Sequence, residues 1–317
     1  LPLSIRRQRQ MCIRDSSIAR LDTAPPFDDR GRCPSSMNNV LDLTRMDLLL
    51  VAIACILAIA IGVLLAKKQA RAFDKSKGDD HPKVNLFDYG DLRFLHLGSP
   101  AVQGSMKISQ PFEIHLDYVQ RMMGWLLFTD LDRVTHLRAM QLGLGAATLT
   151  KFCHKQLGMD TTAVELNPEV IDTCQRWFHL PPDNARLKVL LADAAEAVTQ
   201  TQWHGKIDVL HIDLYDAEAA RPALDSLGFY SDCRQLLTQD GCMVVNLFGK
   251  ASQPAVSMKI MTTIFGQDAV WAFNPTPAGN VVVMAFKTPR SPDATYLTEQ
   301  AKKINARWAL PTDLSLI

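Results

Sequence analysis

The spacing of hydrophobic and polar positions switches repeatedly between strand and helix periods after Leu137. Short apolar runs alternate there with amphipathic segments, a pattern typical of strands that alternate with helices. The predicted strands are 139–144, 162–166, 187–191, 207–212 and 242–248, and the predicted helices among them are 148–156, 168–177, 194–199 and 222–237. This alternation predicts a parallel sheet that is covered by helices on both faces.

The end of the chain predicts a different kind of pairing. Two more apolar runs, 269–273 and 280–286, are separated only by the loop NPTPAG, so we expect them to pair antiparallel. A helix over 293–308 follows. The expected fold class is therefore α/β, a Rossmann-like methyltransferase fold with a mostly parallel seven-stranded sheet and an antiparallel closing hairpin.

Residues 84–130 predict a small separate lobe in front of this sheet. Three short β-like runs at 84–89, 91–97 and 101–108 are broken by turn residues, and they predict a small antiparallel element. Apolar side chains then recur at helical spacing over 112–128. We expect an N-terminal β/helix lobe, followed by a nucleotide-binding catalytic domain at 131–317.

Residues 46–68 are predicted to form a transmembrane anchor. The run 48–66 is apolar and uncharged, has no polar face, and is long enough to cross a bilayer as a helix. Lys67, Lys68 and Arg71 follow it directly. By the positive-inside rule we expect a single-pass protein of the inner (cytoplasmic) membrane, with its catalytic domain in the cytoplasm.

The segments on either side of this run carry no predicted structure. Residues 69–83 read as a charged linker. Residues 1–45 are expected to be a non-native or disordered leader, because they are polar, lack a helical or strand period, and contain RRQRQMCIRDS at 6–16, which resembles a translated adapter. Translation is then expected to start at Met46, with Met37 as the second candidate.

Composition narrows the possible partners. The formal net charge is +1, so charge gives no indication of nucleic acid or of a strongly acidic partner. The seven cysteines form no C-x-x-C pair and no cluster with histidine. This spacing indicates neither a disulfide framework nor a zinc site. A reducing compartment and no metal cofactor are therefore expected.

Three features at predicted strand ends indicate a nucleotide site. Gly143 and Gly145 follow the first strand of the sheet and open a helix, where glycine allows a tight turn and a close approach of the backbone to a ligand. Glu165 ends the next strand and is suited to accept hydrogen bonds from ribose hydroxyls. Asp193 and Ala194 follow the third strand, where a carboxylate could accept the amino group of adenine.

NAD and S-adenosyl ligands both use such a glycine turn and such an acid. The third glycine of the dinucleotide fingerprint, which makes room for a pyrophosphate, is replaced by Thr148. Asp193 and Ala194 also stand at the adenine-binding position of S-adenosyl enzymes. The pattern therefore favours S-adenosylmethionine, or its decarboxylated form, as the co-substrate over a dinucleotide.

Two acids after the fourth strand are the candidate catalytic groups. Asp213 and Asp216 follow directly on IDVLHI, beside the expected position of the nucleotide sulfonium. Acids in that place could hold a substrate amine and accept its proton as it attacks carbon. The alternative is a structural one, in which an aspartate caps the next helix.

At these residues the chain resembles the spermidine synthase (polyamine aminopropyltransferase) family, from about residue 94 to residue 286. The matching segments are LGLGAAT, AVELNPEVI, LADA, LGFYSDCRQLLTQDGCMVVN, and IDLYD against the catalytic D-x-x-D of the family. The resemblance implies that Asp213 is the catalytic base and Asp216 an anchor for the substrate amine. It likewise implies that Glu165 binds ribose, that Asp193 binds adenine, and that Gln103 reaches over the nucleotide from the N-terminal lobe.

The chain departs from this family at three places. Ala146 and Ala147 occupy the glycine turn, where the family usually has an aspartate that holds the amine end of the donor. Ile-His-Leu at 114–116 replaces the Tyr-His-Glu motif that helps to bind the diamine, and Ala217 replaces the usual proline. The residues of the family signature that bind the nucleotide are kept, whereas several of those that bind the amine substrates are replaced.

The leading hypothesis is an aminopropyltransferase that uses decarboxylated S-adenosylmethionine and a small-molecule amine acceptor in polyamine biosynthesis. The second is a methyltransferase that uses intact S-adenosylmethionine, which the loss of the acid in the glycine turn favours. The third is a non-catalytic nucleotide-binding module tethered to the membrane, which the retention of Asp213 and Asp216 disfavours. The family resemblance also suggests a homodimer.

Overall fold

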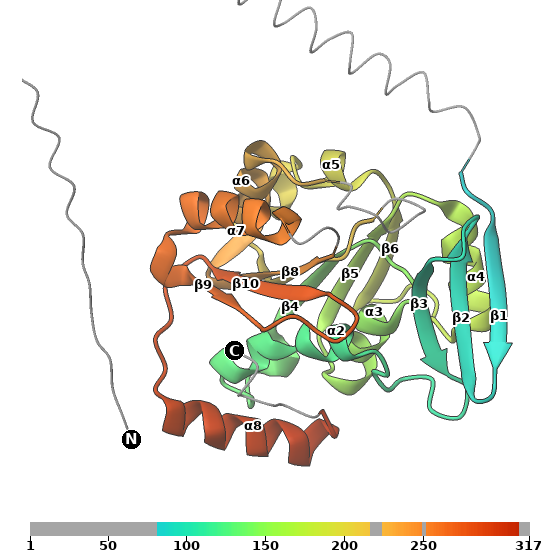
Figure 1. Ribbon diagram of the computed structural model, residues 1–317, viewed down its shortest axis with the longest axis horizontal. Coiled ribbons are helices and arrows are strands. Elements are labelled where there is room, and N and C mark those ends of the chain that lie inside the picture. Colours follow the sequence, from blue (N-terminus) through green and yellow to red (C-terminus); the bar gives the residue numbers. More distant parts are fainter. Residues whose placement is uncertain (1–80, 216–223, 249–251, 311–317) are drawn as a thin grey trace, which may run out of the picture. The chain divides into compact units, whose positions relative to one another are not determined.

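A seven-stranded sheet forms the centre of the described part of the chain (Figure 1). The structure is a computed structural model, and it describes residues 81–215, 224–248 and 252–310. The strand order is β6-β5-β4-β7-β8-β10-β9. The strands are β4 (Arg138–Leu142), β5 (Asp160–Glu165), β6 (Leu187–Leu191), β7 (Ile207–Ile212), β8 (Leu237–Leu247), β9 (Val270–Ala272) and β10 (Val281–Phe286).

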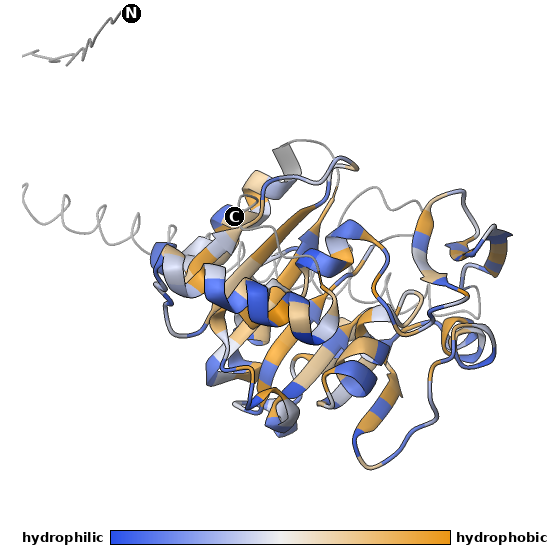
Figure 2. Ribbon diagram, turned by 90° about the horizontal axis from the view of Figure 1, so that it is seen from below, coloured by the Kyte–Doolittle hydropathy of each residue, from blue (hydrophilic) through white to orange (hydrophobic). Residues whose placement is uncertain are grey.

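The pairing of these strands confirms the predicted closing hairpin. β6, β5, β4, β7 and β8 pair in parallel, whereas β10 runs antiparallel to both β8 and β9. The parallel strands are largely apolar, and Figure 2 shows hydrophobic colouring along most of the sheet, with hydrophilic positions on the surrounding helices. Burial of both faces of the sheet accounts for this composition.

Local signals set the start of several helices. Asn167 caps α4 (Pro168–Trp177) by accepting the Glu169 backbone N–H at 2.9 Å, and Pro168 takes the first helical position. Side-chain caps also begin the helices α5 (Ala194–Ala197), α6 (Leu227–Leu236) and α8 (Ala294–Trp308). The remaining α-helices among the described residues are α2 (Asp117–Arg121), α3 (Thr148–Lys151) and α7 (Ser252–Phe265).

Two helical segments differ from the sequence prediction. The helix predicted over 112–128 is only the short α2 followed by the 3-10 helix η1 (Gly124–Phe128), because Leu116 has an extended backbone conformation. α7 was not predicted. Its buried face carries Ser257, Met261 and Phe265 at intervals of four, and the polar serine within this face weakens the apolar period.

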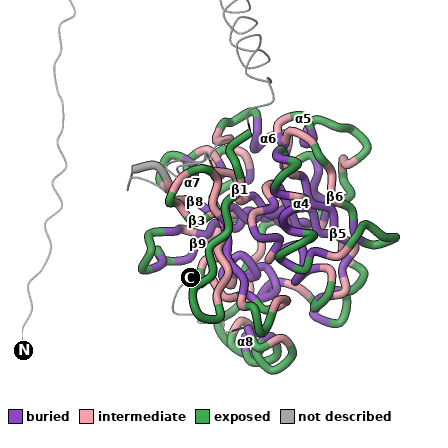
Figure 3. The backbone as a smooth tube through the Cα atoms, turned by 90° about the vertical axis from the view of Figure 1, so that its right-hand side faces the viewer, coloured by how far each residue is buried: buried purple, intermediate pink, exposed green. Residues whose placement is uncertain are grey.

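The first three strands form a separate antiparallel sheet, as predicted. β1 (Val84–Tyr89) pairs with β2 (Leu92–Leu97), and β2 pairs with β3 (Val102–Lys107). β1 is the exposed edge strand (Figure 3). β3 lies against the turn after β4, since a Cβ added to Gly104 would come within 2.6 Å of the Ala146 backbone nitrogen. The predicted domain boundary at residue 130 stays a prediction.

The predicted membrane location requires correction. In the described ranges, no helix has both the length and the apolar character needed to cross a bilayer. The predicted anchor at 46–68 lies outside the described residues. A long apolar run satisfies the hydropathy requirement for a membrane helix, but hydropathy alone does not establish that a spanning helix forms.

A buried lysine joins the small sheet to the large one. Lys151, at the end of α3, is 1% exposed, and its Nζ donates to the Phe178 carbonyl at 2.6 Å and to the Pro111 carbonyl at 2.7 Å. Burial lowers the pKa of Lys151 to about 8. The ammonium therefore connects α3, the segment after β3 and the end of α4 at a cost in desolvation.

We expect the stability of the protein to depend on pH through Lys151. The pKa is about 8 in the folded state and about 10.4 in an unfolded chain. Between these values the unfolded state binds more protons, so the free energy of unfolding should rise with pH, by about 2 kcal/mol from this group between about pH 8 and about pH 10. Lys151→Met should remove this rise. The measurement is urea unfolding of both proteins at about pH 8 and about pH 10.

Lys155→Met is the matched control, because Lys155 is exposed and lies one helical turn further along the chain. This variant should keep the pH dependence of the wild type. Equal slopes of stability against pH in the wild type and in Lys151→Met would contradict the assignment to Lys151.

Candidate functional site

The candidate site lies at the carboxyl edge of four adjacent strands. Gly143 follows β4, Glu165 ends β5, Asp193 follows β6 and Asp213 follows β7. These four strands are neighbours in the order β6-β5-β4-β7, so the loops after them meet at one edge of the sheet. Open α/β sheets bind ligands at this edge.

Two glycines allow the turn after β4 to approach its neighbours closely. Gly143 has a φ of +84°, and an added Cβ there would overlap the Asp213 carbonyl oxygen. Gly145 has a φ of +51°, and its Cβ would lie 2.9 Å from the carbonyl oxygen of Gln103 on β3. Glycine is thus needed at both positions, for conformation as well as for space. The turn is held between the loop after β7 and the small N-terminal sheet.

Glu165 connects the glycine turn with the end of its own strand. Its Oε2 accepts the Leu144 backbone N–H at 2.9 Å, and its Oε1 accepts the Asn167 N–H at 2.9 Å. Burial raises the pKa of Glu165, and these hydrogen bonds act in the opposite direction. The two bonds fix the direction in which the carboxylate points.

Asp193 performs the structural task of capping a helix. Its Oδ1 accepts the Ala195 backbone N–H at 2.8 Å at the start of α5, where Ala194 is the first helical residue and is buried. An aspartate in this position is expected for the cap alone. The geometry is therefore compatible both with a structural role and with the predicted contact to adenine.

Asp213 is held by two neutral side chains from other elements. The Tyr118 hydroxyl, from α2, donates to its Oδ2 at 3.2 Å, and the Asn246 amide, from β8, donates to its Oδ1 at 2.9 Å. Burial raises the pKa of Asp213, although both hydrogen bonds favour the charged form. Asp213 is thus a carboxylate of increased basicity next to the glycine turn.

Sequence reasoning gave no role to the two partners of Asp213. Tyr118 lies within the segment 112–128, for which the apolar period predicts a helix and no chemistry. Asn246 ends a family segment, and it is a polar residue near the carboxyl end of an otherwise apolar strand. A polar residue at that place in an apolar strand is the feature of the sequence that could have indicated a role for Asn246. Asp216, the predicted partner of Asp213, lies outside the described residues together with Ala217.

A small cavity brings several predicted residues together. Its volume is about 20 Å³, and its lining includes Gln103, Gly145 and Asp213, together with Tyr118 and Gln141. This volume holds about one water molecule. The cavity therefore places the N-terminal sheet, the glycine turn and the candidate catalytic acid around a common space.

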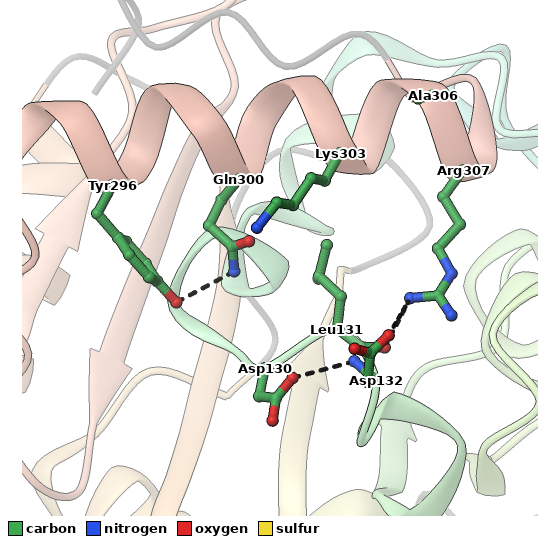
Figure 4. A pocket seen from close by; sticks show the side chains of 8 residues that line it. All are labelled: Asp130, Leu131, Asp132, Tyr296, Gln300, Lys303, Ala306 and Arg307. Atoms are coloured by element: carbon green, nitrogen blue, oxygen red, sulfur yellow. Dashed lines mark hydrogen bonds and ion pairs between the residues drawn. The ribbon is translucent and has the colours of Figure 1, made fainter.

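A much larger cavity, of about 690 Å³, lies elsewhere (Figure 4). It separates α8 from the turn at 130–132 and shares no lining residue with the predicted site. Both acidic side chains in its lining have partners: Asp132 pairs with Arg307 at 3.1 Å, and Asp130 accepts the Asp132 backbone N–H at 3.1 Å. These acids are engaged within the wall, whereas the strand edge gathers Glu165 and Asp213, two half-buried carboxylates whose pKa is raised. Carboxylates of raised pKa are characteristic of active sites. We therefore assign the candidate site to the strand edge.

Comparisons with known proteins agree with this assignment. A family model described as a spermine/spermidine synthase domain matches residues 143–275. The polyamine aminopropyltransferase of Neisseria meningitidis serogroup A is 33% identical over 234 residues, which cover 72% of this chain and 86% of that protein.

Solved structures share the fold. A probable spermidine synthase from Corynebacterium glutamicum has a TM-score of 0.57 at 19% identity, covering 70% of this chain and 83% of that one. Human methyltransferase-like protein 13, in complex with SAH, has a TM-score of 0.56 at 19% identity, covering 63% and 95%. At this identity the two structures support the methyltransferase-like fold alone. With the sequence match to the Neisseria protein, however, the predicted resemblance is confirmed: the chain belongs to the spermidine synthase (polyamine aminopropyltransferase) family.

Proposed function

We propose that this protein transfers an aminopropyl group from decarboxylated S-adenosylmethionine to a small amine, as a step of polyamine biosynthesis. Membership of the family makes the protein a transferase, so the hypothesis of a non-catalytic module is set aside. The observation that carries the proposal is the Asp213 carboxylate, which is held beside the glycine turn by Tyr118 and Asn246.

The donor nucleotide would bind along the strand edge. Each oxygen of Glu165 accepts one backbone N–H, and a carboxylate oxygen has a second acceptor site for a ribose hydroxyl. Asp193 and Ala194 would bind the adenine. Gly143 and Gly145 would let the backbone approach the nucleotide, while Gln103 would cover it from β3. The contacts of Glu165 and of the glycines support this arrangement.

Asp213 would act as the general base. The amine nitrogen attacks the methylene carbon next to the sulfonium, the carbon–sulfur bond breaks, and its electron pair leaves with methylthioadenosine. The proton lost by the amine passes to Asp213, whose raised pKa suits a proton acceptor. Asp216 would hold the amine in line with the carbon, and this orientation supplies much of the rate increase.

A second candidate is methyl transfer from intact S-adenosylmethionine. It is favoured by Ala146 and Ala147, which bring no negative charge to the glycine turn. Ala146 is 3% exposed and lies against Gly104 of β3, so this position offers no room for a larger acidic side chain. Without such an acid, the turn does not repel the carboxylate of the intact nucleotide.

Calorimetric titration of the full-length protein with both nucleotides tests the choice. We expect the decarboxylated form to bind at least about tenfold more tightly than the intact form, because it lacks the carboxylate that would face Asp213. A tenfold difference in affinity corresponds to about 1.4 kcal/mol. Preference for the intact nucleotide would favour methyl transfer. Failure of both to bind would contradict the nucleotide site.

Glu165→Gln provides the control for this titration. Ribose is common to both nucleotides, so loss of the charge at Glu165 should weaken both to the same extent, by about 10- to 100-fold, as expected for a hydrogen bond to a charged group. A variant that binds both nucleotides like the wild type would remove Glu165 from the site.

A further inference from the structure

An amide side chain lies buried in the middle of the large sheet. Asn246 is 4% exposed and belongs to β8, which has β7 on one side and β10 on the other. Its Nδ2 donates to the Asp213 Oδ1 at 2.9 Å, and its Oδ1 accepts from the Asn280 Nδ2 at 3.0 Å. Its backbone carbonyl accepts the Tyr215 hydroxyl at 2.8 Å. A buried amide is costly unless its polar atoms are paired, and here both ends are paired.

The series of hydrogen bonds continues into the loop before β10. Asn280 is 9% exposed, and its backbone N–H donates to the Thr276 Oγ1 at 3.0 Å. The Thr276 hydroxyl in turn donates a hydrogen bond to the Asn280 Oδ1, at 3.4 Å. The Thr276 N–H and the Gly279 N–H close the loop with bonds of 2.8 Å each.

The Asp213 carboxylate sets the direction of the whole series, because an ionised carboxylate only accepts hydrogen bonds. Asn246 therefore donates to Asp213, Asn280 donates to Asn246, and the Thr276 hydroxyl donates to Asn280. A reversed Asn280 amide would place two carbonyl oxygens face to face, and a reversed Asn246 amide would place its carbonyl oxygen against the Asp213 carboxylate. The orientation of both amides therefore follows from the network. Hydrogen bonds in such a series polarise one another, which strengthens the last donor.

We propose that Asn246 and Asn280 are positioning residues, which hold the Asp213 carboxylate in the orientation that accepts the proton of the substrate amine. The inference rests on the role of Asp213 in the proposed function. A neutral amide on Oδ1 stabilises the carboxylate without adding a charge. It thereby directs Oδ2, which Tyr118 contacts, toward the cavity that adjoins the glycine turn.

Two other titratable groups face Asp213 among the described residues. They are Tyr118 from α2 and Tyr215 from the loop after β7. Burial, together with the negative charge of Asp213, raises the pKa of both hydroxyls, so both remain neutral over the working range of the enzyme. Neither tyrosine therefore adds a titration step of its own, and a shift in the pKa measured at the Asp213 carboxyl carbon reports on Asp213.

The test is the pKa of Asp213 in the full-length Asn246→Leu variant, measured by ¹³C NMR of protein labelled at the aspartate carboxyl carbon. The signal is assigned by its loss in Asp213→Asn. We expect the pKa to rise by about one unit, because a hydrogen bond to the charged form is lost. The acidic limb of the pH profile of kcat/KM should move to higher pH by the same amount. The kcat should fall by about tenfold, with the KM for the nucleotide unchanged.

Thr238→Val is the matched control on the same strand. The Thr238 hydroxyl donates to the Asp208 Oδ1 at 2.9 Å, at the opposite end of β7 from Asp213. Thr238→Val removes one hydrogen bond to a carboxylate, as Asn246→Leu does, but it should leave the Asp213 signal and the pH profile unchanged. Asn246→Gln keeps the amide donor and should recover part of the wild-type profile.

The second variant, Asn280→Ala, leaves Asn246 in place and should shift the pKa of Asp213 in the same direction by a smaller amount. An Asp213 pKa that is unchanged in both folded variants would overturn the proposal, even if activity fell. Absence of transfer in the wild type would contradict the proposed function instead. The NMR titration does not need activity, so the two failures remain distinguishable.

Discussion

Asp213→Asn is expected to lower the rate of group transfer by about a hundredfold or more, because the substituted amide cannot accept the proton of the attacking amine. The local structure should survive. The new carbonyl oxygen can still accept from Asn246, and the new amide faces the Tyr118 oxygen, which is able to accept a hydrogen bond. The measurement is the steady-state release of methylthioadenosine, together with calorimetric titration of the nucleotide.

Asp225→Asn is the control for the loss of a carboxylate. Asp225 also accepts hydrogen bonds from two hydroxyl groups, of Tyr230 in α6 at 3.0 Å and of Ser257 in α7 at 2.8 Å, but it does not line the cavity at the glycine turn. This variant should retain turnover in its folded fraction. Turnover of Asp213→Asn at the wild-type rate would remove Asp213 from the mechanism.

Gly143→Ala is expected to cause the largest loss of stability among single substitutions in the site. Alanine at a φ of +84° carries a conformational strain of about 1–2 kcal/mol. Its Cβ would also overlap the Asp213 carbonyl oxygen, a backbone atom that cannot move without displacing the loop after β7. We expect the free energy of unfolding to fall by about 3 kcal/mol or more, and nucleotide binding to be lost.

Gly205→Ala separates the two causes. Gly205 has a φ of +67°, and an added Cβ would meet nothing within 4 Å. This variant should therefore lose only the conformational part, about 1 kcal/mol. Urea unfolding measures both losses. Equal losses in the two variants would show that the close approach of the turns after β4 and β7 has no energetic consequence.

The sheet could be predicted from the sequence because its strands carry their own signals. The bounds predicted for β1, β6 and β7 agree with those in the structure, since turn residues or charged residues border each apolar run. α7 was not predicted, because the polar Ser257 on its buried face weakens the apolar period. The predicted strand ends also indicated a common site, because Gly143 and Asp213 each follow directly on a strand of a parallel sheet, and such strand ends meet at one edge.

The partners of Asp213 could not be predicted in the same way. Tyr118 and Asn246 are 95 and 33 residues distant from Asp213 in the sequence. Their contacts depend on how α2 and β8 pack around β7, and no local period encodes that packing. The predicted membrane location was also wrong: it was drawn from the apolar run at 48–66 and the basic residues after it, and no described helix is long and apolar enough to support it.

The most direct test of the account is product analysis by mass spectrometry. The full-length protein is incubated with decarboxylated or intact S-adenosylmethionine and a set of small amines. We expect the decarboxylated nucleotide to yield methylthioadenosine and an aminopropylated amine in equal amounts, and Asp213→Asn to yield neither above background. Formation of S-adenosylhomocysteine and a methylated amine from the intact nucleotide, with no product from the decarboxylated form, would contradict it.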